Sequence, residues 1–125
     1  MSTEATITEA PTLTAQQVAD QIVTALEGGS NYWLEQFKPI KGKELAAESP
    51  WYACPNVWAG DYEIEILADE DSKTYSFTPE KLKAGLEWLA KNHPDRITEI
   101  VEETGDAETA DVFLQACVLG DIVYG

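Results

Sequence analysis

The chain has 125 residues, of which 8 are Lys or Arg and 23 are Asp or Glu, so its formal net charge is −15. Charge of this sign repels phosphate backbones and anionic lipid, so we expect no direct binding of nucleic acid or of a membrane surface. Hydrophobic residues make up 44% of the chain, which is enough for one folded core. The composition therefore favours an acidic protein of one domain.

The first twelve residues lack periodic hydrophobicity and are predicted to form a flexible N-terminal tail, followed by one domain over residues 13–125. The N-terminus has no basic start followed by an apolar run, so a secretion signal is not expected. No window approaches about 18 consecutive apolar residues, so a membrane-spanning helix is not expected either. Cys54 and Cys117 lie among apolar neighbours without CxxC spacing, which favours reduced, partly buried thiols. A cytoplasmic location is the expectation.

The first predicted helix begins after Thr14, which forms a capping-box pattern with Gln17, and runs to Glu27 with apolar residues at helical spacing. Gly28-Gly29 follows and is expected to end the helix through a positive φ angle. The alternative, a phosphate-binding loop, needs glycines between a strand and the N-terminus of a helix. Here the order is helix, glycines, strand, which favours a helix stop.

Strand patterns occupy the middle of the chain. Residues 32–37 contain strand-forming aromatics, and Tyr62, Ile64 and Ile66 alternate with carboxylates. A turn-like segment then leads to a second strand over residues 74–77, so a hairpin is predicted. Residues 38–56 hold three prolines and are expected to form an irregular aromatic loop.

Helical patterns dominate the C-terminal part, with predicted helices from Pro79 to about Asn92, over residues 95–103 and over residues 107–119, where Gly105 and Gly120 mark the ends. The last five residues, "DIVYG", are apolar for a terminus and are expected to dock on the body as an extended segment. The fold class is therefore predicted to be α+β, with a small antiparallel sheet of about three strands packed against about four helices in a single domain.

Carboxylates form two groups, one on the predicted hairpin and one on the last two helices. An acidic run is normally a solvated face, but regularly placed carboxylates can also imitate phosphates and occupy a nucleic-acid channel on another protein. Under this second interpretation the partner-binding residues of the hairpin are Asp61, Glu63, Glu65, Asp69, Glu70 and Asp71, and those of the helices are Glu99, Glu102, Glu103, Asp106, Glu108 and Asp111.

Six tryptophan and tyrosine residues lie between positions 32 and 62, several of them in or beside the irregular loop. Aromatics on loops can anchor a partner, although small domains usually bury their tryptophans. The candidates for exposed anchors are Trp51, Tyr52 and Trp58.

Catalytic and metal-binding patterns are weak. The segment "DEDSK" (residues 69–73) lacks the glycine and the distant bidentate Glu of a calcium loop, and His93 has no partner at ligand spacing. Neither GxSxG nor a Cys-His arrangement occurs. We therefore expect no metal, no cofactor and no enzyme activity, although two carboxylates meeting in a cleft could still carry acid-base chemistry.

Two stretches, "ALEGGSNYW" (residues 25–33) and "TADVFLQACVLGDIVYG" (residues 109–125), resemble a family of small proteins of tailed bacteriophages and prophages. The resemblance implies a small accessory protein made in an infected or lysogenic bacterial cell, and it assigns no catalytic residue. By analogy, acidic phage products of this size include inhibitors of host nucleases that mimic double-stranded DNA.

The leading hypothesis is thus a non-enzymatic protein whose acidic surface docks on the basic nucleic-acid-binding site of a host defence protein, of the CRISPR or restriction type. The alternative is a protein that binds or sequesters a small nucleotide-like signal in an aromatic pocket formed by Asn31, Tyr32, Trp33 and Lys38. A third hypothesis is a phage structural or assembly factor that forms a homo-oligomer through the C-terminal segment.

Overall fold

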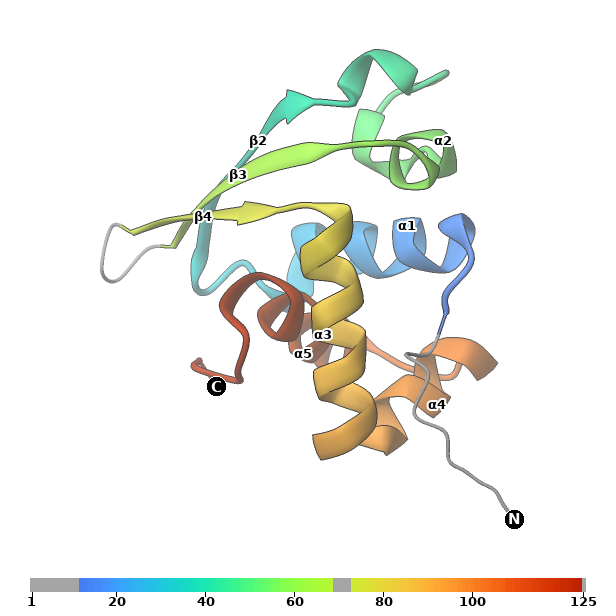
Figure 1. Ribbon diagram of the computed structural model, residues 1–125, viewed down its shortest axis with the longest axis vertical. Coiled ribbons are helices and arrows are strands. Elements are labelled where there is room, and N and C mark those ends of the chain that lie inside the picture. Colours follow the sequence, from blue (N-terminus) through green and yellow to red (C-terminus); the bar gives the residue numbers. More distant parts are fainter. Residues whose placement is uncertain (1–11, 69–72, 125) are drawn as a thin grey trace.

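The computed structural model of the chain describes residues 12–68 and 73–124. Its sheet has three strands in the order β2 (Leu34–Lys41), β3 (Glu63–Ala68) and β4 (Thr74–Phe77), and both pairings are antiparallel. On β3, Ile64, Ile66 and Ala68 are buried and alternate with more exposed residues, so they share one face of the sheet. The predicted hairpin and antiparallel sheet are confirmed (Figure 1).

The first strand differs from the prediction at both ends. It begins at Leu34 instead of residue 32, because Trp33 and Leu34 both donate their backbone N–H to the carbonyl of Ser30 and complete a turn there. It then continues to Lys41, and Pro39 is accommodated next to an irregularity in the pairing with β3. The predicted N-terminal tail falls on residues 1–12, of which 1–11 lie outside the described residues.

Five helices accompany the sheet in the described part of the chain: α1 (Ala15–Thr24), α2 (Pro55–Ala59), α3 (Pro79–Asn92), α4 (Pro94–Glu102) and α5 (Ala107–Leu119). The short α2 was not predicted; it begins at the end of the segment expected to form an irregular loop, where Pro55 occupies the first helical turn. The capping box of Thr14 and Gln17 is present at the start of α1. The α+β class is confirmed.

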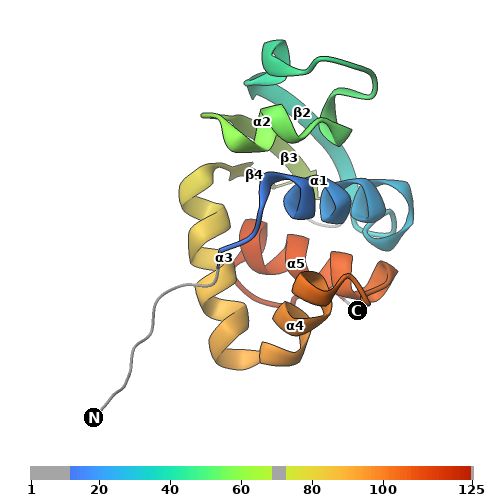
Figure 2. The ribbon, with the colours of Figure 1, turned by 90° about the vertical axis from the view of Figure 1, so that its right-hand side faces the viewer.

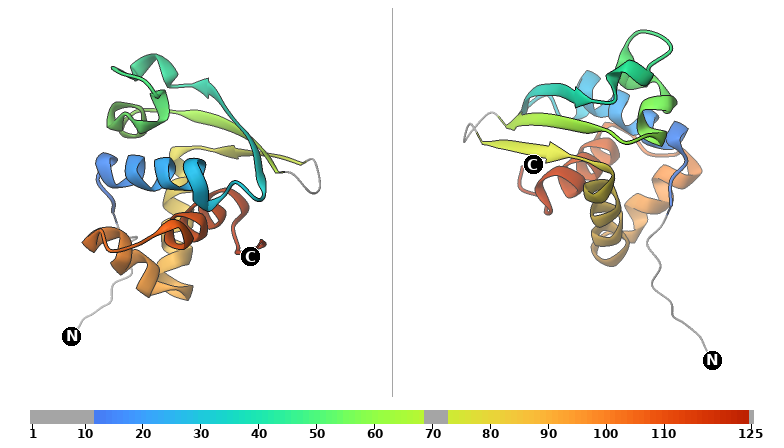
Figure 3. Two further views of the ribbon diagram at one scale, coloured as in Figure 1. Left: turned by 180° about the vertical axis from the view of Figure 1, so that it is seen from behind. Right: turned by 45° about the horizontal axis from the view of Figure 1, so that its top comes forward.

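The elements are layered, with the sheet at one end of the molecule, α1 beneath it, and α5 and α4 beyond α1 (Figures 1 and 2). Helix α3 runs along the side and packs on both α5 and α4. The views in Figure 3 show the same order from behind and from above. Helix α5 is therefore surrounded by other elements and forms the centre of the helical layer.

Nearly every residue of α5 between Thr109 and Val118 is buried. The close crossing of α3 and α5 requires a glycine, because a Cβ atom at Gly85 would lie 2.6 Å from Cα of Cys117. Both cysteines are buried free thiols, as predicted. Burial raises the pKa of the Cys117 thiol, so this residue acts as a small apolar side chain.

The Gly28-Gly29 pair does not end its helix in the way predicted. Among the described glycines, positive φ angles occur at Gly42 and Gly120. Helix α1 instead widens into a π turn, Ala25–Gly29, and the chain leaves it at Ser30. A Cβ atom at Gly29 would lie 2.4 Å from the backbone oxygen of Ala107, so glycine is needed here for close approach to the start of α5.

Candidate functional site

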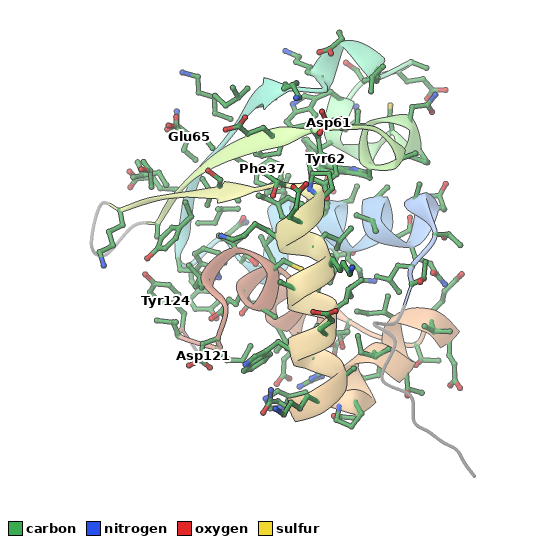
Figure 4. All side chains as sticks on the ribbon, viewed as in Figure 1. Phe37, Asp61, Tyr62, Glu65, Asp121 and Tyr124 are labelled. Carbon is green, nitrogen blue, oxygen red and sulfur yellow. The ribbon has the colours of Figure 1, made fainter. Side chains whose placement is uncertain are left out.

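The acidic residues of the hairpin are partly neutralised by lysines on β2. Asp61 forms an ion pair with Lys41 at 2.7 Å, and Glu65 lies opposite Lys38 in the antiparallel register. Asp61 and Glu65 both point away from the helices in Figure 4. The remaining predicted residues of this group, Asp69, Glu70 and Asp71, lie outside the described residues. The described part of the hairpin thus presents alternating charges.

The helical group gathers where α4 turns into α5. Glu102, Glu103 and Asp106 are exposed there, and we call these three residues the acidic corner. Asp106 also caps α5 by accepting the backbone N–H of Glu108 and Thr109. Glu103 takes a left-handed conformation (φ 60°) and ends α4, two residues before the glycine predicted to do so. The corner therefore has a defined backbone geometry.

Arg96 is the cation nearest to this group in sequence, and it already forms two ion pairs. It donates to Glu99 at 3.1 Å and to Glu108 at 2.9 Å, which ties the start of α4 to the start of α5. Glu99 is half-buried and also accepts the Thr109 hydroxyl at 2.6 Å. Glu99 and Glu108 therefore hold the two helices together. Within the described residues, no ion pair joins the acidic corner to a basic side chain.

A small hollow of about 180 Å³ adjoins the corner between α1 and α4. Its lining includes Asp20 and Glu103, so the acidic surface continues onto α1. The side-chain oxygen of Gln21, also in the lining, is buried and accepts no hydrogen bond. Every one of these groups attracts hydrogen-bond donors or cations.

The sheet and α4 lie at opposite ends of the molecule (Figure 1), so the two predicted acidic groups do not form one surface.

Asp111 was predicted to be a surface contact and is instead buried, with 7% of its surface exposed. Its Oδ1 accepts the Ser30 hydroxyl at 2.8 Å and the Trp33 indole N–H at 2.7 Å. Its Oδ2 accepts the Tyr32 hydroxyl and the Gln115 amide, the latter at 3.1 Å. Four donors occupy the lone-pair positions of one carboxylate, so this charge is held by hydrogen bonds inside the protein.

These bonds join the two stretches on which the phage resemblance depends. Ser30, Tyr32 and Trp33 come from the segment after the π turn, whereas Asp111 and Gln115 come from α5, about 80 positions further along the chain. Burial and the hydrogen bond to Asp111 raise the pKa of Tyr32 to about 12, so its hydroxyl stays protonated near neutral pH. It can therefore donate to the carboxylate.

Gln115 connects the same network to the C-terminal segment. Its Oε1 accepts the backbone N–H of Val123 and Tyr124, both at 2.8 Å, and its Nε2 donates to the Tyr124 carbonyl at 3.1 Å. The ring of Tyr124 stacks on Trp33 with centroids 5.3 Å apart. The predicted docking of this segment is confirmed for residues 121–124, and Figure 4 shows Asp121 and Tyr124 beside the end of α5.

A cavity of about 510 Å³ opens beside this network. The π turn, the N-terminal half of α5 and the C-terminal segment form its walls, and its ionisable lining residues are Tyr32, Glu108, Asp111 and Tyr124. Val112 and Ile122 add apolar surface. The complete lining is Gly28, Gly29, Tyr32, Ala107, Glu108, Asp111, Val112, Gln115, Ile122 and Tyr124.

The aromatic pocket predicted from the sequence is only partly present. Tyr32 is 52% exposed and lines the cavity, but Trp33 is fully buried and contributes from behind, through its bond to Asp111. Asn31 and Lys38 are exposed and are not among the lining residues. The turn at Ser30 sends Lys38 onto β2, away from α5, which the sequence pattern could not show.

The predicted loop anchors are more buried than expected. Trp58 is only 5% exposed and donates its indole N–H to the Tyr52 carbonyl, so it cannot serve as an exposed anchor. Trp51 and Tyr52 are half-buried, and Trp51 stacks on Phe37. Trp58 packs in turn against Tyr62 and Phe77. Figure 4 shows Phe37 and Tyr62 near the same end of the sheet. The loop is thus part of the core.

The residues that the sequence analysis missed are Ser30, Gln115 and Tyr124. A usable signal was present, because Asp111 and Gln115 are four positions apart on the most apolar helix and therefore share one face of it. Two polar side chains on a buried helix face must find partners. Which partners they find depends on the tertiary structure.

Three negative findings complete the description. The described residues contain no group of three or more His, Cys, Asp or Glu side chains placed to hold a metal ion, and none of their helices is long and apolar enough to cross a membrane. Comparisons of the chain with protein-family models, curated proteins and solved structures find no match.

Proposed function

We propose that the protein is a non-enzymatic inhibitor made in a phage-infected or lysogenic bacterial cytoplasm, and that its acidic corner docks on the basic nucleic-acid-binding surface of a host defence protein. The observation that carries the proposal is the exposed carboxylate set Glu102, Glu103 and Asp106, whose neighbouring cation, Arg96, is already paired. The net charge of −15 supports fast association with a basic partner. The phage context rests on the resemblance alone.

The corner is better suited to this role than the hairpin. Lys38 and Lys41 would meet a basic partner with like charge, whereas Asp20 and the hollow next to Glu103 extend the anionic surface at the corner. The backbone there is fixed by the cap of α5 and by the Arg96 bonds. A partner therefore meets carboxylates whose positions are set before binding, which lowers the entropic cost of association.

Matched charge variants test the proposal. The corner variant combines Glu102→Gln, Glu103→Gln and Asp106→Asn, and Asn retains the ability to cap α5. The hairpin variant combines Asp61→Asn, Glu63→Gln and Glu65→Gln. Both remove three negative charges, one at the corner and the other on the hairpin, where the pair of Asp61 with Lys41 is also lost.

The readout is the plating efficiency of a targeted phage on bacteria that carry a CRISPR or restriction system. Expression of the wild-type protein and of the hairpin variant should restore plating, and the corner variant should not. A protein captured from the host lysate should be released by duplex DNA and by raised salt, because contacts between exposed charges are screened. Full protection by the corner variant would refute the proposal.

The cavity favours a second candidate function, the binding of a small ligand. Its volume of about 510 Å³ falls within the range of about 300 to 1,000 Å³ that is common for ligand sites. A nucleotide-like anion is not favoured by its charges, because Glu108 and Asp111 line the cavity. Thermal-shift measurements against a panel of nucleotides and of amines would separate the two ligand classes, since bound ligand raises the melting temperature.

A further inference from the structure

The cavity beside Asp111 has the chemical character of a site for a cation. Glu108 and Asp111 are three positions apart on α5, so both carboxylates lie on the helix face that borders the cavity. No lysine, arginine or histidine belongs to its lining. Within the described chain, Glu108 is paired with Arg96, and no ion pair joins Asp111 to a basic side chain.

The hydrogen bonds of Asp111 fix its position without removing its charge. Four neutral donors surround the carboxylate, and none of them carries a positive charge that would cancel its own. The charge is therefore presented at a constant place beside the cavity, in surroundings of lower dielectric constant than water, where it attracts a cation more strongly. The start of α5 offsets part of this attraction for a cation, because the N-terminus of a helix carries a partial positive charge.

The aromatic walls favour a planar cation over a spherical one. Tyr32 is 52% exposed at the rim, and Tyr124 is held in the wall by stacking on Trp33. A guanidinium group can stack on an aromatic face while its N–H groups donate to Glu108, which an ammonium group does less well. Asp111 acts through its charge alone, because four donors already fill its lone-pair positions. Val112 and Ile122 offer apolar contact for the methylene stem of such a side chain.

We propose that the cavity lined by Tyr32, Glu108 and Val112 receives an arginine side chain of the basic partner. This inference rests on the proposed function, because Glu108 stands between the cavity and the acidic corner, at the start of α5. The cavity is large enough for the arginine with its flanking main chain. The corner then supplies attraction over a distance, and the cavity supplies recognition of one side chain.

NMR titration with capped tripeptides tests this directly. The probes are acetyl-Gly-Arg-Gly-amide, its lysine analogue and its uncharged citrulline analogue. The chain has four tryptophans, and the indole N–H of Trp33 is bonded to Asp111, so its signal reports on the cavity. The arginine peptide should shift the signals of the Trp33 indole and of the Gly28 and Gly29 amides saturably. The affinities of the lysine and citrulline peptides should be lower by about tenfold or more.

Two variants of equal charge provide the control. Val112→Lys places a positive charge in the lining of the cavity, and its repulsion should weaken binding of the arginine peptide about tenfold or more. Val101→Lys adds the same charge at an exposed site on α4 and should leave the Trp33 shift unchanged. One-dimensional spectra of both variants check that they fold.

Contrary outcomes are distinct from failure of the proposed function. Equal shifts of the Trp33 signal with arginine and lysine peptides would overturn the inference, as would shifts confined to Glu102 and Glu103 with no change at Trp33. Tighter binding of free arginine than of the capped peptide would also overturn it, in favour of a small-molecule site. None of these results depends on the plating assay, which tests the acidic corner alone.

Discussion

At the scale of single residues, Asp111 shows that a carboxylate in an acidic protein can be structural. It is buried, and its four hydrogen bonds connect the segment after the π turn, α5 and, through Gln115, the C-terminal segment. Hydrogen bonds to a charged group contribute about 1.5 to 3 kcal/mol each. If these donors were lost, the buried charge of Asp111 would destabilise the fold, because no basic side chain in the described residues forms an ion pair with it.

Asp111→Asn should therefore destabilise the protein by about 3 kcal/mol or more. The asparagine NH2 group would replace one acceptor oxygen, and an N–H donor of Trp33 or Gln115 would then face it without a partner, because unlike a hydroxyl it cannot accept. Urea unfolding followed by tryptophan fluorescence measures the change. The exposed control Asp95→Asn should shift the free energy of unfolding by less than about 0.5 kcal/mol. A neutral effect of Asp111→Asn would mean that the network contributes little to stability.

At the scale of elements, the meeting of the π turn with the start of α5 positions both the cavity and the network. This contact is close because Gly29 lies against the backbone of Ala107. Ser30, the residue after the turn, is fully buried and bonds to Asp111 one helical turn further along α5. The site therefore exists only when these two elements approach closely, and a side chain between them would separate them.

The neighbouring glycines allow a matched test of this contact. At Gly29 a Cβ atom would lie 2.4 Å from the oxygen of Ala107, whereas at Gly28 no heavy atom lies within 4 Å of one. Gly29→Ala should destabilise the protein by about 2 kcal/mol or more, because backbone must move. Gly28→Ala should be neutral or stabilise by up to about 1 kcal/mol, since alanine restricts the unfolded chain. Thermal unfolding of both variants gives the comparison, and equal effects would contradict the close-approach argument.

At the scale of the whole molecule, charge is distributed unequally over the layers. The sheet end combines carboxylates with Lys38 and Lys41, and the far end carries the acidic corner with Arg96 already paired. Such a distribution gives the molecule one end with a stronger negative field, which orients it toward a basic partner. It also means that like charges repel one another within the folded protein.

Added salt should therefore stabilise the protein. At about 0.01 M ionic strength charges interact over about 30 Å, and at about 1 M over about 3 Å, so salt screens the net repulsion of the folded chain. We expect the melting temperature at pH 7 to rise across this range. The corner variant, with three fewer charges, should show a smaller rise. A melting temperature that falls with salt would show that the Arg96 and Lys41 ion pairs outweigh the repulsion.

The sequence by itself determined the four longer helices, the hairpin and the α+β class, because hydrophobic periodicity and capping residues such as Thr14 and Asp106 act over a few neighbouring positions. Only the tertiary structure decided which acidic and aromatic side chains face solvent. Asp111 and Trp58 are buried because elements distant in the sequence cover them, and Gly29 is required by a contact with α5. Burial and long-range hydrogen bonds depend on the packing of elements, and local patterns do not contain that information.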